Sequence, residues 1–192
     1  MGESDPLIAP AAFVASGDYI ELLDEGRATD VAAARARERG LRRVAEETAE
    51  LAGTLVDLAE QRAPVAVGTL AGRRHHAAVV GVGGDYCVLR TGSGAEIHLR
   101  LDAITTVRPQ PGDRQDVASG AQRPVTDRLL TEVLGRLAGE RRRVSLVTRT
   151  GEVVAGELRA VGTDVISVRL DGAGGDTCYV AAAALSEALV EH

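Results

Sequence analysis

The hydrophobic and polar positions of the chain follow two different periods. Between residues 41 and 61, a seam of apolar side chains and one threonine recurs every three or four positions with charged residues between them, at Leu41, Val44, Thr48, Leu51, Leu55 and Leu58. This is the spacing of one face of an α-helix, and Pro64 ends it. A shorter run of the same kind, residues 130–137, predicts a second helix. The helix over 41–61 could lie as an amphipathic helix on a barrel, or form a helical hairpin or a dimer zipper.

Short runs of apolar and β-branched residues between glycine-containing turns predict ten strands. The first five are expected at residues 65–70, 73–82, 85–90, 95–100 and 104–108. The second five are expected at residues 144–149, 153–161, 164–170, 177–180 and 185–190. Strands of this length with glycine turns are typical of small antiparallel barrels.

The two groups of strands are copies of one pattern. A shift of 79 residues places Val65–Arg90 on Val144–Arg169, and twelve positions between Leu51 and Arg90 are then identical to their counterparts. The loop at 171–176 is two residues longer than its counterpart, so the shift becomes 81 beyond it. An internal repeat of this length predicts a duplicated helix-plus-strands module.

These patterns divide the chain into five predicted segments. They are an acidic and apolar N-terminal arm at 1–28, a helical segment at 29–62, a first barrel at 63–109, a Pro/Gly-rich linker at 110–124, and a helix with a second barrel at 125–192. The predicted fold class is mainly β with helices (α+β). It consists of two tandem five-stranded antiparallel barrels, each preceded by a helix, and an N-terminal helical extension.

Composition limits the location and the ligands. The 192 residues are 45% hydrophobic and 26% charged, with no signal peptide and no long apolar span, so we expect a cytoplasmic protein that does not enter a membrane. Aromatic residues make up 2%, which leaves few rings to stack on bases. All 22 basic residues are Arg, and Lys and Asn are absent, which indicates a GC-rich bacterial origin. Cys87 and Cys178 occupy unequal repeat positions, which indicates reduced thiols.

Charge is distributed unevenly around the net value of −6. The first predicted barrel is basic, while the N-terminal arm and the second barrel are acidic, so a polyanion would meet the first barrel. We expect RNA or another polyanion to contact the cations Arg73, Arg74, His75, His76, Arg90, His98 and Arg100. The alternative is a solvated strand face, because neighbouring residues of a strand point to opposite sides.

The second repeat carries a family resemblance. A helix precedes five bent strands, and a turn glycine, a mid-strand glycine and two core positions follow in the order Gly151, Gly156, Leu158 and Val161. This pattern resembles the Sm/LSm family, and Leu101–Pro109 (LDAITTVRP) is similar to the last strand of Hfq, its bacterial RNA chaperone. The resemblance covers residues 51–109 and 126–190. It implies small Sm-like barrels and RNA binding, with Arg100 at the family's basic position.

No constellation of residues predicts catalysis. The chain has no recognisable Ser-His-acid set, no helical pair of metal-binding histidines and no placed carboxylate dyad, so we expect a protein that is not an enzyme and uses no cofactor and no metal. The run Gly81–Gly84 predicts a turn. Two functions remain open. One is an RNA- or DNA-binding regulator that uses the cationic face of the first barrel. The other is an oligomerisation or protein-interaction scaffold that contacts copies of itself or another protein through the barrel edges and helix 41–61.

Overall fold

The structure is a computed structural model that describes residues 34–41, 43–44, 47, 49–110, 120–172 and 174–191. Its contacts divide the chain into two units, residues 1–44 and residues 45–192. In the first unit, residues 34–41, 43 and 44 are helical and exposed. The predicted arm at 1–28 lies outside the described residues. The strands and the two remaining helices all belong to the second unit.

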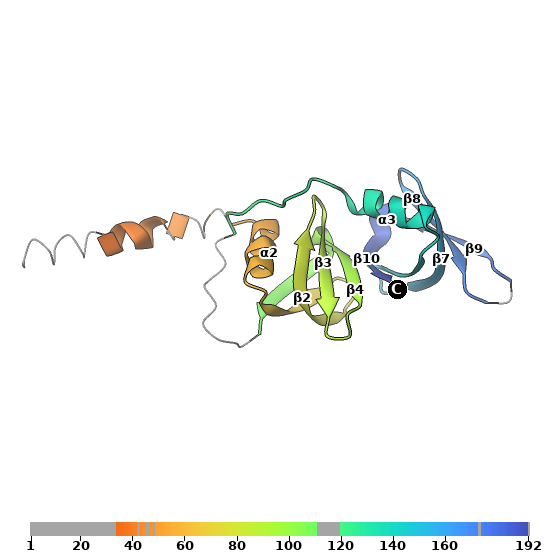
Figure 1. Ribbon diagram of the computed structural model, residues 1–192, viewed down its shortest axis with the longest axis horizontal. Helices are drawn as coiled ribbons and strands as arrows, with labels where there is room; N and C mark the ends of the chain where they lie inside the picture. The colour runs from red at the N-terminus through yellow and green to blue at the C-terminus, as the bar shows by residue number, and fades with distance from the viewer. Residues whose placement is uncertain are drawn as a thin grey trace, which may run out of the picture. The chain divides into compact units, whose positions relative to one another are not determined.

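The second unit contains one order of elements twice (Figure 1). The first half comprises α2 (Leu51–Glu60), β1 (Pro64–Thr69), β2 (Arg74–Val82), β3 (Tyr86–Thr91), β4 (Glu96–Arg100), the 3-10 turn η1 (Leu101–Ala103) and β5 (Ile104–Pro109). The second half comprises α3 (Leu130–Gly139), β6 (Arg143–Thr148), β7 (Val153–Val161), β8 (Val165–Leu170), β9 (Thr177–Ala181), η2 (Ala182–Ala184) and β10 (Leu185–Val190). Each predicted strand agrees with an observed strand to within one residue at each end.

The strands form one antiparallel sheet of ten strands, in the order β5-β1-β2-β3-β4-β10-β6-β7-β8-β9. The predicted fold class of two separate five-stranded Sm-like barrels is therefore wrong. In each half the fifth strand pairs with the first strand and not with the fourth, so neither half closes on itself. Instead, β4 of the first half pairs with β10 of the second half, and the sheet continues through both halves.

Two hydrophobic cores lie along this sheet, one in each half. The inward residues of the strands and one face of the preceding helix supply them, with Leu55 and Leu89 in the first core and Leu134 and Leu158 in the second. Helix α2 packs on β2 and α3 packs on β7 (Figure 1). Each half also contributes a side chain to the core of the other half. Leu189 of the second half packs against the first core, and Tyr86 of the first half belongs to the second core. The two halves are thus joined by shared apolar packing as well as by the β4–β10 ladder.

The predicted helix over 41–61 is not one continuous helix. Residues 49 and 50 are not helical, and the extended backbone of Glu50, with φ −104° and ψ 148°, precedes the start of α2 at Leu51. The N–H of Glu50 donates to the carbonyl of Gly120 at 3.2 Å, so this residue bonds to the predicted linker at 110–124. A continuous apolar seam over 41–61 therefore does not form. None of the helices in the described ranges is long and apolar enough to cross a membrane.

Candidate functional site at the joint and the open edges of the sheet

The joint between the halves is built on the β4–β10 ladder. Its register places Glu187 opposite Leu99, Ala188 opposite His98, Leu189 opposite Ile97 and Val190 opposite Glu96. Residues on one face of β10 point toward the first core and residues on the other face point toward the second core. Strand β10 therefore serves both halves.

Glu187 is the acidic centre of the joint. Its side chain is 3% exposed, and its Oε2 lies 2.7 Å from the Nε2 of His75 while its Oε1 lies 3.2 Å from the Nε of Arg73. A buried carboxylate is costly unless hydrogen-bonding and charged partners compensate it. Both partners come from the first half. Arg73 and His75, which were predicted to bind a polyanion, therefore contact Glu187 of the second half.

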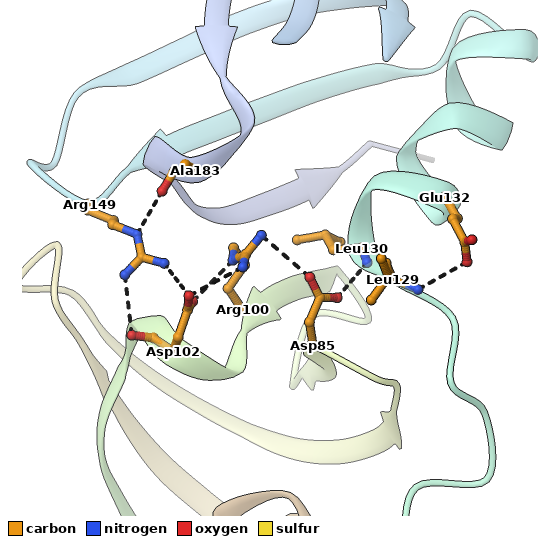
Figure 2. Close-up of polar contacts among 8 residues, drawn as sticks. All are labelled: Asp85, Arg100, Asp102, Leu129, Leu130, Glu132, Arg149 and Ala183. Carbon is orange, nitrogen blue, oxygen red and sulfur yellow. Dashed lines mark hydrogen bonds and ion pairs between the residues drawn. The ribbon is translucent and has the colours of Figure 1, made fainter. Parts of the chain in front are cut away.

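A second polar network crosses the joint on the side of η1 (Figure 2). Arg100 lies 3.4 Å from Asp85 and 3.1 Å from Asp102, and Arg149 of the second half lies 2.6 Å from Asp102. The Nε of Arg149 also donates to the carbonyl of Ala183 at 3.0 Å. Arg100, another predicted polyanion-binding residue, is thus held between two carboxylates and is 18% exposed.

The charges in this network shift its pKa values. The hydrogen bond to Asp102 raises the pKa of the Arg100 guanidinium above its ordinary value. Burial alone would raise the pKa of Asp102, but hydrogen bonds from Arg100 and Arg149 outweigh burial and hold that pKa below its ordinary value. The network is therefore a set of charged pairs that stabilise one another.

Asp85 links this network to the start of α3. Its Oδ1 accepts a hydrogen bond from the N–H of Leu130 at 2.7 Å. The N-cap position of α3 is Leu129, whose side chain has no oxygen, so the carboxylate of Asp85 takes the place of a capping side chain. The N–H of Leu129 donates to Glu132 at 3.1 Å (Figure 2). An acid of the first half thus caps the first turn of a helix of the second half.

His98 lies inside the joint. It is 9% exposed, and its ring centroid lies 6.1 Å from that of Tyr86. Burial lowers the pKa of His98 because it penalises the charged imidazolium. Its Nδ1 has no hydrogen-bond partner among the described residues. His98 is therefore a buried residue of the joint and does not belong to an exposed cationic face.

The remaining predicted cations lie on the outer face of the first half. Arg74, His76 and Arg90 are exposed, and the Nδ1 of His76 lies 2.5 Å from the Nε2 of Gln110 while Arg90 pairs with Glu96 at 2.6 Å. His76 and Arg90 line an open groove of about 810 Å³ that Arg62 also lines. Ladder pairing places Arg108 on this face, because Arg108 and His76 both lie opposite Ala66. The cations predicted from the sequence did not include Arg62 and Arg108.

The two ends of the sheet form the second part of the candidate site. In the described part of the chain, β5 pairs only with β1, and β9 pairs only with β8. Tyr179 of β9 is 71% exposed, and Leu70, whose N–H donates to the carbonyl of Ala103 just before β5, is 50% exposed. Leu51 at the start of α2 is 41% exposed. An open edge presents unpaired backbone N–H and C=O groups that can pair with another strand.

Neither cysteine belongs to a metal site. Both are free thiols, and burial raises the pKa of Cys87 to about 12. Across the described ranges, no group of three or more His, Cys, Asp or Glu side chains is arranged to hold a metal ion.

Comparison with known proteins identifies no family for this chain. No protein-family model matches the chain, and no curated protein matches it. The resemblance to the Sm/LSm family therefore stays a prediction, and the function must be argued from the geometry.

Proposed function

We propose that this chain is a non-enzymatic cytoplasmic protein-interaction module that binds protein strands at the two open edges of its sheet. The observation that carries the proposal is the joint itself, where β4 of one half already accepts β10 of the other half as a neighbouring strand. Free thiols at Cys87 and Cys178 support a reducing compartment.

The composition of β9 supports this proposal. Natural edge strands are usually protected by charged residues, prolines or bulges that prevent further pairing. Residues Thr177–Ala181 (TCYVA) contain no charge and no proline, and Tyr179 at their centre is exposed. Strand β9 therefore presents an unprotected edge that suits β-strand addition.

The backbone pattern identifies which N–H groups are available on β9. The N–H of Ala182 donates to the carbonyl of Asp164, and the N–H of Leu170 donates to the carbonyl of Asp176, both across β8 and β9. Hydrogen-bonded pairs alternate along an antiparallel ladder, so Cys178 and Val180 bond to β8 while Tyr179 directs its N–H to the open side. A proline at position 179 would therefore remove an outward donor without breaking the β8–β9 ladder.

This property defines the experiment. Fluorescently labelled peptides of residues 103–110 and 184–191, which contain β5 and β10, are titrated against the full chain by anisotropy. We expect at least one peptide to bind the wild-type chain and to bind Tyr179→Pro about tenfold more weakly, while Tyr179→Ala, which keeps the N–H, retains the larger part of the binding. If neither peptide binds the wild-type chain, strand addition at this edge is excluded.

Polyanion binding is the second candidate function, and the outer face of the first half favours it. Its exposed cations gather around the groove and along the neighbouring strands, namely Arg62, Arg74, His76, Arg90 and Arg108. Arginines on an exposed face neutralise phosphates without reading bases. This set replaces the one expected from the sequence, because Arg73, His75, His98 and Arg100 are held in the joint.

The matching test avoids residues of the joint. Arg62→Ser with Arg74→Ser removes two exposed charges, and we expect it to weaken binding of labelled poly-U and to reduce the slope of log Kd against log salt. Arg159→Ser, on β7 of the second half, is the control. Equal binding by both variants and the wild-type chain would refute this candidate.

A further inference from the structure

We infer that the partner at the open edges is a second copy of this chain, joined head to tail so that β9 of one copy pairs with β5 of the next. This inference rests on the strand-addition function proposed above. By the internal repeat, β9 is the counterpart of β4 and β5 is the counterpart of β10. Because β4 and β10 already pair in the joint, the two open edges are the two sides of a joint of the same kind.

The repeat fixes the register of this second joint. With the shift of 81 residues, the pair Ala188 and His98 becomes Val107 of one copy and Tyr179 of the neighbouring copy. The direction of the backbone N–H groups of β5 is compatible with this register. The N–H of Gln110 donates to Pro64 across β5 and β1, so Arg108 bonds to β1 and Val107 directs its N–H outward. Val107 and Tyr179 can therefore exchange backbone hydrogen bonds as a facing pair.

The start of α2 offers a matching contact. In the joint, Asp85 accepts the N–H of Leu130 at the start of α3. Their counterparts under the shift of 79 residues are the identical pair Asp164 and Leu51. The side chain of Glu50, the N-cap residue of α2, makes no capping hydrogen bond, and Asp164 is exposed. The second joint therefore brings Asp164 of one copy to the first turn of α2 of the next, where a carboxylate is favourable.

The exposed apolar side chains have counterparts that the joint buries. Leu51 is 41% exposed while Leu130 is fully buried, and Tyr179 is 71% exposed while His98 is 9% exposed. Neighbouring copies would bury the exposed member of each pair. Leu70 is 50% exposed, and its counterpart Arg149 is 29% exposed in the joint.

The second joint replaces an ion pair with an apolar contact. Arg149 and Asp102 are 2.6 Å apart in the joint, and their counterparts are Leu70 and Ala183. Both positions are charged in the first joint and apolar in the second, so each contact is complementary. The ion pair therefore distinguishes the first joint from the second, because Leu70 and Ala183 carry no charge.

A new charge pair appears at the far end of the second joint. In the joint, Leu189 lines one hollow together with Ser93, Gly94 and Ala95. The counterparts of Leu189 and Ala95 are Arg108 and Asp176, so an Arg of one copy meets an Asp of the next. Opposite charges at this position favour the head-to-tail register.

A charge exchange tests this register on the full chain. Sedimentation velocity over a range of protein concentrations measures self-association of the wild-type chain, Arg108→Asp, Asp176→Arg and the double variant. We expect the wild-type chain to associate, each single variant to associate about tenfold more weakly, and the double variant to recover the wild-type affinity. Arg159→Asp, an exposed charge on β7, serves as the matched control and should leave association unchanged.

The outcomes separate this inference from the proposed function. If the wild-type chain stays monomeric while the strand peptides bind it, the head-to-tail inference is overturned and the strand-addition function stands. If the chain associates but the double variant does not recover, the register is wrong and the inference is overturned. If neither peptides nor copies bind, both proposals fail.

Discussion

His75 and Glu187 are separated by 112 positions in the sequence, yet the Nε2 of His75 lies 2.7 Å from the Oε2 of Glu187. The contact joins β2 of the first half to β10 of the second half, and both side chains are buried. Glu187 also contacts Arg73. The cations that the sequence presents as one basic strand are thus divided between the joint, where Arg73 pairs with Glu187 although it is 45% exposed, and the outer face, and this division changes which function they support.

Replacement of Glu187 by Gln should destabilise the protein strongly. The substitution keeps the size of the side chain but removes the charge that faces Arg73 and His75, so we expect a loss of about 2–3 kcal/mol in the free energy of unfolding. Urea denaturation measures this loss. Glu191→Gln is the matched control, since Glu191 lies just past the end of β10 and forms an exposed pair with Arg143, for which we expect a loss of about 0–1 kcal/mol. Equal losses in the two variants would contradict the role of Glu187.

His98 should make stability depend on pH. Its pKa is lowered from 6.5 by burial, so below about pH 6.5 the unfolded chain binds a proton that the folded chain binds less well. The contribution of His98 to stability is therefore complete above pH 6.5 and falls as the pH decreases below it. We expect His98→Phe, which keeps a ring beside Tyr86, to reduce the slope of unfolding free energy against pH between about 7.5 and 5.5, measured by urea denaturation. Identical slopes for the variant and the wild-type chain would refute this role.

Local sequence patterns predicted the elements of this fold but not their assembly. The bounds of β2 and β7 follow from apolar alternation and flanking glycines, which are local signals. The pairing of β4 with β10 depends on which of several exposed edges meet, and alternation within either strand carries no information about that choice. The prediction of two separate five-stranded barrels was wrong because this pairing joins all ten strands into one sheet.

Part of the candidate site could also have been found from the sequence. Strand alternation places His75 and His76 on opposite faces, so one basic strand could not supply one basic surface. Glu187 lies within the run LSEALV, and an acid in an otherwise apolar strand indicates a buried charge that needs cationic partners. The identity of those partners, Arg73 and His75, depends on the joint and could not be read from either repeat alone.

Gly156 should tolerate no side chain, although its counterpart in the first half is Ala77. A Cβ atom at Gly156 would lie 2.0 Å from the carbonyl oxygen of Arg169, so the backbone of β7 or β8 would have to move. We expect Gly156→Ala to lower the free energy of unfolding by about 2–3 kcal/mol. Gly135→Ala in α3 is the control, because no atom lies within 4 Å of its Cβ position and alanine favours a helix by about 1 kcal/mol. Denaturant unfolding of both variants should therefore give opposite signs, and a neutral Gly156→Ala would show that the two halves bend alike.

Arg141 should be replaceable by Gly with a gain in stability. Its φ of 53° lies in the left-handed region, as does the φ of 52° at its counterpart Arg62, and each residue follows the end of a helix. The N–H of Arg142 donates to the carbonyl of Leu137 at 3.1 Å, a hydrogen bond that spans Arg141 at the end of α3 and requires this conformation. Relief of about 1–2 kcal/mol of left-handed strain exceeds the entropic cost of glycine, about 0.5–1 kcal/mol, so we expect Arg141→Gly to gain about 0.5–1 kcal/mol in urea denaturation. Arg136→Gly, within the same helix, should instead lose about 1 kcal/mol, and a loss at both positions would show that the left-handed turn carries no strain.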